Sequence, residues 1–366
     1  LVPSHFHRHA GTDTGDFTRV MSKLILAVSL IFALAVPASA VEFTAPQVPE
    51  GGAELMPENT GSFAAGLTEL LRDAILHLRP DLKEASKVSL GVIAAVMMVS
   101  LLQSFSGSVK TVANLAGATA IAAGLLLSAN SLIRLGSQTV TEISEYGKLL
   151  LPVMTAAMAA QGGAASSTAL YAGTAMFDSV LSALISRMLG PMVYLFLALS
   201  AANGAIGENI LGKLRDLVKN VVSWSLKAIL TVFTTYMTVT GVVSGTTDAA
   251  ALKAAKVTIS SVVPVVGGIL SDASEAVLVS AGLMKNAAGI YGILAVLAVF
   301  LSPFLKIGVH YLILKLTAAV CGIFGEKGLT ELIGDFSTAM GLLLAMTGSE
   351  CLLLLISTVC FLKGVG

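Results

Sequence analysis

Long apolar stretches separated by short polar segments make up most of the chain from Val88 onward. A membrane-spanning helix needs about 20 apolar residues, and most of these stretches approach that length. They cover residues 88–105, 111–133, 149–160, 168–185, 189–206, 221–243, 287–305, 309–324 and 338–362. The pattern predicts an all-α, polytopic transmembrane helical bundle with roughly seven to nine membrane-embedded segments. It leaves open whether the pieces after Leu149 and after Ser260 cross the membrane or re-enter it.

A more polar region over residues 41–87 precedes these stretches and contains one amphipathic pattern. Apolar residues recur at helical spacing between Ser62, a plausible N-cap, and Pro80, a plausible stop. Such a helix would rest on the outer membrane face, bind a partner or pack on the bundle. The multi-span membrane domain follows over residues 88–366.

The beginning of the chain has the layout of a secretory signal. A charged start at Met21-Ser22-Lys23 is followed by an apolar run over 24–36 and an A-x-A site that ends at Ala40. This order predicts a signal peptide over residues 21–40, which would leave residues 41–87 outside the cytoplasm. Residues 1–20 are then expected to be an over-extended leader, with Met21 as the start.

Composition excludes several classes of function. Of the 366 residues 55% are apolar and 12% charged, whereas soluble domains have about 25% charged residues. The 22 basic and 22 acidic residues cancel, so binding to nucleic acid has no electrostatic support. The three cysteines form no CxxC pair or zinc motif, and no GxxxxGK[ST] sequence is present. We therefore expect no cofactor, no metal and no enzymatic activity.

Prolines suggest an internal repeat. Pro152 and Pro191 are 39 residues apart, as are Pro264 and Pro303. The two halves would cover 149–245 and 261–362. Broken helices at matching positions of two halves are where transporters place a central pathway. Alternatively, the prolines only mark helix starts.

Basic residues indicate an orientation. The densest cluster, Lys213, Arg215 and Lys219, lies in a predicted loop over residues 211–220. The excess of lysine and arginine in cytoplasmic loops assigns this loop to the cytoplasm.

Five ionisable residues lie in or beside the predicted spans, where such residues are costly and are candidates for a pathway. They are Asp178, Arg187, Lys306, His310 and Glu350. They would line a conduit or serve proton- or ion-coupled movement. Alternatively, they pair across helices or reach the interface. Glu350 lies mid-span and is too short to reach the interface, so His310 and a lysine from a neighbouring helix are the candidate partners.

A second candidate region covers residues 249–286, where charged residues alternate with apolar stretches. Its candidate residues are Lys253, Lys256, Pro264, Gly267 and Gly268. The pattern suits two short helices at the membrane interface, which would contact partners or gate a pore. An ordinary surface hairpin fits equally well.

Several sequence blocks resemble stage III sporulation protein AE of endospore-forming bacteria. These are LP at 151–152 with AAQGGA at 159–164, LKAAK at 252–256 with VPVVGG at 263–268, SDASEAV at 271–277, SAGLMKNAAG at 280–289, and PFLK at 303–306 with KLTAAV at 315–320. The polar block over 252–289 is the most specific of them, because apolar sequence resembles that of every membrane protein.

The resemblance implies a multi-pass protein of the mother-cell membrane around the forespore. Its partners would be the other stage III sporulation proteins, AA to AH, and protein Q of the forespore. Together they would form a secretion-like channel that sustains late forespore development. The family pattern supplies no catalytic residues. A competing interpretation is an independent secondary transporter with an internal repeat.

Overall fold

The structure is a computed structural model that describes residues 46–58, 62–103, 108–158, 164–206, 209–239, 287–324 and 327–363. These residues are almost entirely helical and include no strand. Outside them lie the predicted leader and signal peptide and the block over 249–286. That block includes Pro264, one of the four prolines on which the proposed repeat rests. All the described helices belong to one unit that begins at Ala45.

Most of the described residues lie in long helices. In chain order the elements are α2 (Glu50–Ala53), α3 (Phe63–His77), α4 (Arg79–Gln103), α5 (Ser108–Met158), α6 (Ala164–Leu184), the π-helix η2 (Ile185–Leu189), α7 (Gly190–Ile206), α8 (Asn209–Val239), α11 (Ala287–Phe324) and α12 (Lys327–Lys363). Within the described ranges, 6 helical stretches are long and apolar enough to cross a membrane, with α6, η2 and α7 counted as one. The structure thus confirms the predicted all-α polytopic fold.

Three predicted interruptions are absent from these helices. The short stretch over 149–160 is not a separate segment, because α5 continues through it to Met158. The predicted spans 287–305 and 309–324 form one helix, α11, with Pro303 inside it. The spans 168–185 and 189–206 are joined without a loop by η2. Proline is tolerated inside membrane helices because neighbouring groups satisfy the backbone that it frees, and a single polar residue does not end a helix.

The prediction of a basic loop over 211–220 is also wrong. These residues form the first turns of α8, which begins at Asn209. Lys213, Arg215 and Lys219 therefore project from a helix that continues into an apolar span.

The helices are longer than one bilayer requires. At 1.5 Å per residue, the 51 residues of α5 span about 77 Å, against about 30 Å for a hydrocarbon core. Arg134, Glu145 and Lys148 are exposed on the second half of α5. Charged residues that face lipid are costly, so this part of α5 is expected to face water or protein.

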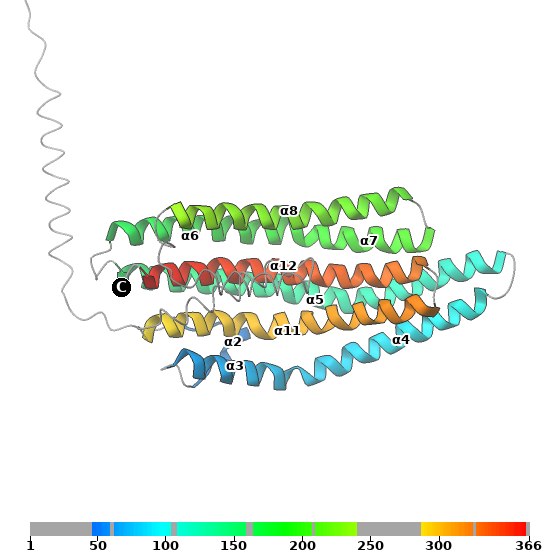
Figure 1. Cartoon of the computed structure of the whole chain (residues 1–366), viewed down its shortest axis with the longest axis horizontal. Helices are drawn as coiled ribbons and strands as arrows, with labels where there is room; N and C mark the ends of the chain where they lie inside the picture. Colours follow the sequence, from blue (N-terminus) through cyan, green and yellow to red (C-terminus); the bar gives the residue numbers. More distant parts are fainter. Residues whose placement is uncertain are drawn as a thin grey trace, which may run out of the picture. The chain divides into compact units, whose positions relative to one another are not determined.

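Helix α12 is the central element. It contacts α5, α6, α7, α8 and α11, and in Figure 1 it lies beside α5 in the middle of the bundle. In its most apolar window 94% of the residues are buried inside the bundle. Polar groups on α12 therefore have to be satisfied by protein rather than by lipid headgroups or water.

The predicted amphipathic helix corresponds to α3. It begins at Phe63, directly after Ser62, and ends at His77. Pro80 does not stop it but lies in the first turn of α4, where proline is tolerated. The buried side of α3 includes Leu70 and Ala74, and the helix packs against α11. Packing on the bundle is thus the arrangement that the structure adopts.

Gly52 allows α2 to dock on α11. A Cβ atom at this position would lie 2.7 Å from the backbone nitrogen and 2.9 Å from the Cα of Val299. Since backbone atoms cannot rotate away, Gly52→Ala is expected to lower the free energy of unfolding by about 1–3 kcal/mol. Thermal unfolding of the purified protein in detergent measures this. A Cβ at Gly91 meets nothing within 4 Å, so Gly91→Ala is the control and should not destabilise. Equal effects of the two substitutions would contradict the close contact.

Candidate functional site

Two of the predicted candidates, Asp178 of α6 and Glu350 of α12, meet inside the bundle. Their carboxyl groups are neighbours across the interface between α6 and α12. Glu350 is 0% exposed and Asp178 2% exposed. The neighbour of Glu350 is thus a second carboxyl group rather than His310, and the cation that acts on it is Lys148 of α5. The interhelical contact therefore joins two acidic side chains rather than an acidic and a basic one.

Helix α5 supplies the polar groups around the pair. Ser144 donates a hydrogen bond from Oγ to Oδ2 of Asp178 at 2.8 Å. Within the described part of the chain, four buried side-chain atoms have no hydrogen-bond partner, and three of them belong to the pair. They are the hydroxyl of Tyr146, Oδ1 of Asp178 and both carboxyl oxygens of Glu350. A buried polar atom without a partner is costly, so this set of atoms stands out from the rest of the core.

Four buried hydroxyl groups of α12 are satisfied within the helix. Thr347, Ser349, Ser357 and Thr358 each donate a hydrogen bond to a backbone carbonyl four residues earlier in the helix. A hydroxyl can do this because it has a proton to donate, whereas an ionised carboxylate only accepts. Among these buried groups of α12, only Glu350 changes its hydrogen-bonding needs with its protonation state.

Small and polar residues let the three helices approach at this level. A Cβ on Gly147 of α5 would lie 3.2 Å from Leu354 and 3.7 Å from Oδ1 of Asp178. Nearby, Thr174 of α6 donates to Oγ of Ser357 on α12 at 3.0 Å. Asp178 faces inward because it lies one turn after Thr174 on the buried stripe of α6. Helices α5, α6 and α12 therefore enclose the carboxyl pair.

Lys306 and His310 lie elsewhere and do not join the pair. Nζ of Lys306 forms an ion pair with Oδ1 of Asp81 in α4 at 2.7 Å, and the lysine side chain is 40% exposed. Nδ1 of His310 lies 2.9 Å from the carbonyl oxygen of Lys306. The two residues lie one turn apart on α11, and Lys306 links that helix to α4.

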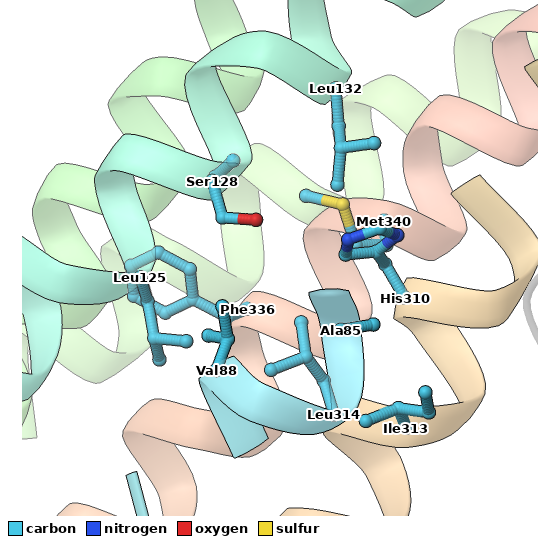
Figure 2. A pocket seen from close by; sticks show the side chains of 11 residues that line it. Ala85, Val88, Leu125, Ser128, Leu132, His310, Ile313, Leu314, Phe336 and Met340 are labelled. Carbon is cyan, nitrogen blue, oxygen red and sulfur yellow. The ribbon is translucent and has the colours of Figure 1, made fainter. Parts of the chain in front are cut away.

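His310 also lines a small cavity between α4, α5, α11 and α12. Figure 2 shows its ring beside Met340, with Ser128 and Phe336 on the facing helices. The volume of the cavity is about 10 Å³, room for a single water molecule at most. Its lining is mostly apolar, so this cavity is not a binding site for an organic ligand.

The remaining predicted candidates fall into two groups. Arg187 lies in η2 with an exposed side chain, away from the buried pair. Lys253, Lys256, Pro264, Gly267 and Gly268 lie outside the described residues.

Sequence reasoning missed an ion pair between α8 and α12. Nη1 of Arg215 lies 2.7 Å from Oδ2 of Asp335, and the side chains are 14% and 15% exposed. Arg215 also contacts the more exposed Asp216 at 3.2 Å. A signal was present, because Asp335 is an acidic residue at the start of a long apolar run. It was hidden by the interpretation of residues 211–220 as a loop.

Metal binding has no support in the part of the chain that the structure describes. No group of three or more histidine, cysteine, aspartate or glutamate side chains is placed to hold an ion. Cys321, Cys351 and Cys360 are buried and are not joined in disulfides.

Comparison with known proteins gives two matches. Residues 57–364 match the stage III sporulation protein AE family. The chain is also 26% identical over 199 residues to the stage III sporulation protein AE of Bacillus subtilis (strain 168). That alignment covers 54% of this chain and 50% of the relative, so the chain spans about half the length of the curated relative that it matches. No solved structure matches the chain.

The long apolar helices and the central, enclosed α12 define the class as a multi-pass α-helical membrane protein. Within this class, the match over most of its length shows that the chain belongs to the stage III sporulation protein AE family.

Proposed function

We propose that this protein is a membrane component of a stage III sporulation assembly that links the mother cell with the forespore. The observation that carries the proposal is the family match over residues 57–364, which includes the 6 stretches suited to cross a membrane among the described residues. The protein would lie in the mother-cell membrane around the forespore and be required for late forespore development.

Its partners would be the other stage III sporulation proteins, AA to AH, and protein Q of the forespore. Together they would form a secretion-like channel across the space between the two membranes. The exposed charges on α5, at Arg134, Glu145 and Lys148, support a protein or aqueous neighbour rather than lipid along that helix. The segment with Lys253 and Lys256 is a further candidate for partner contact or gating.

The protein would act without catalysis of its own. The sequence has no GxxxxGK[ST] motif for nucleotide phosphates and no HExxH or GxSxG motif. Energy for transfer would therefore come from a partner subunit. The basic residues at the start of α8 favour a cytoplasmic position for that end of the helix.

Affinity purification from sporulating cells tests the assembly. The chain is tagged in the spore-forming bacterium that carries it, and membranes are solubilised in mild detergent at successive stages of sporulation. The other stage III proteins are expected to co-purify. A matched strain with Lys253→Glu and Lys256→Glu, expressed at the same level, should retain fewer of them. Purification of the chain alone at every stage would contradict the proposal.

An independent secondary transporter is the alternative, and the buried pair Asp178 and Glu350 favours it. Acidic residues inside a membrane bundle commonly mark ion or proton pathways. Purified protein in sealed liposomes distinguishes the two. Solute uptake driven by an ion gradient, without any partner, would favour the transporter.

A further inference from the structure

We propose that Asp178 and Glu350 together form a binding site for one exchangeable proton in the interior of the bundle. The site stands on residues of α5, α6 and α12 and does not depend on the proposed role in sporulation.

Charge repulsion is the first argument. Two ionised carboxylates in contact, away from water, repel each other strongly, because the low local dielectric does little to screen them. Asp178 and Glu350 are 2% and 0% exposed, and the described residues place no basic side chain between them. One proton on the pair removes this repulsion. Carboxyl groups that share a site in this way are known to share a proton.

Hydrogen bonding indicates which residue holds the proton. Asp178 already accepts a hydrogen bond from Ser144 at Oδ2, as an ionised carboxylate does. Both oxygens of Glu350 lack a donor among the described residues. A protonated Glu350 can donate to Oδ1 of Asp178, which is also without a partner. A single proton on Glu350 thus satisfies both residues.

Few other titratable groups act on the pair. Helix α5 contributes Lys148, whose side chain is exposed. Cys351 adjoins Glu350 on α12. The single cation of this group is Lys148, and solvent screens its charge.

Several charged groups on the other helices around α12 have partners of their own. On α11, Lys306 pairs with Asp81 of α4. Lys315 of the same helix donates a hydrogen bond to the hydroxyl of Tyr311. Helix α7 has no aspartate, glutamate, lysine, arginine or histidine. On α8, the guanidinium of Arg215 is engaged by Asp335, about four turns before Glu350 along α12. The proton therefore remains the cation best placed to neutralise the pair.

Release of the proton would loosen one interface. When the carboxyl group of Glu350 gives its proton to water, two negative charges face each other between α6 and α12. The same interface is held by the hydrogen bond from Thr174 to Ser357. Occupancy of the proton site is thereby coupled to the packing of α6 on α12.

Infrared spectroscopy tests the proposal on the full chain in lipid nanodiscs. The signal is the C=O stretching band of a protonated carboxyl group, recorded in H2O and D2O from neutral to alkaline pH. The wild type is expected to show this band at neutral pH and to lose it at alkaline pH. In Glu350→Gln the band should be absent, because the amide donates to Asp178. In Asp178→Asn the band should persist at a shifted frequency.

Glu145→Gln is the matched control, since Glu145 is exposed on α5, and it should leave the band unchanged. Circular dichroism confirms that each variant is folded. Absence of the band from the wild type, or its persistence in Glu350→Gln, would overturn the proposal. Loss of the band on addition of sodium at constant pH would also overturn it, in favour of a metal cation as the ligand.

Discussion

Asp335→Ala is expected to lower the free energy of unfolding by about 3 kcal/mol, because it leaves the Arg215 guanidinium without its main partner between α8 and α12. The two side chains are only 14% and 15% exposed, and their charged atoms are 2.7 Å apart. Asp216 remains as a partner at 3.2 Å but is itself 52% exposed, so it compensates only in part. Denaturant unfolding of the purified protein in detergent measures the change.

The same helix offers a control for Asp335→Ala. Glu331 pairs with Lys327 at 3.9 Å, with side chains 43% and 91% exposed. Exposed pairs of this kind contribute about 0–1 kcal/mol, so Glu331→Ala should change stability little. In the double variant Arg215→Met, Asp335→Leu the unpaired charge is gone, and most of the loss should be recovered. If Asp335→Ala and Glu331→Ala were equally mild, the ion pair would not hold α8 to α12.

Glu350→Leu is expected to destabilise the bundle by about 2 kcal/mol, because it removes the hydrogen-bond donor that faces Asp178. The sign of the change is informative. If both carboxyl groups were ionised, removal of one would relieve repulsion and stabilise the protein instead. Glu350→Gln keeps a donor of similar size and should stay within about 1 kcal/mol of the wild type.

A double-mutant cycle isolates this interaction. Asp178→Val alone should destabilise because Glu350 then has no acceptor. Asp178→Val together with Glu350→Leu replaces the pair by apolar side chains and should be more stable than the sum of the single changes indicates. Additive effects would mean that the two side chains do not interact in the folded protein.

The sequence predicted the helical class well, because apolar runs of sufficient length have few alternatives in a membrane. It also predicted the start of α3 at Ser62–Phe63, because helical spacing and an N-cap residue are local signals. It did not predict that α5 continues through its charged segment. Charged residues such as Arg134 and Lys148 ended the apolar pattern, but a helix backbone forms its hydrogen bonds whatever side chains it bears.

The candidate site was predicted in its members but not in its geometry. Glu350 and Asp178 stood out because each is an acidic residue in an apolar run, which sequence alone reveals. Their proximity is a tertiary fact, set by α6 and α12 packing side by side around Gly147. An expectation of opposite charges led to His310 instead. Ser144 was missed because a single hydroxyl in a polar segment has no distinguishing signal.

Counting heat-resistant spores tests the central claim most directly. The claim is that this membrane protein is needed for sporulation and that its buried pair, Asp178 and Glu350, is needed for that role. The gene is deleted in its spore-forming host and restored as the wild type or as Glu350→Gln, with equal membrane levels confirmed by immunoblot. Deletion should reduce heat-resistant spores severely and the wild type should restore them. Glu350→Gln, folded but unable to exchange the proton, should restore them poorly. Normal spore counts after deletion would contradict a role in sporulation. Full rescue by Glu350→Gln would show that the proton site is not needed for that role.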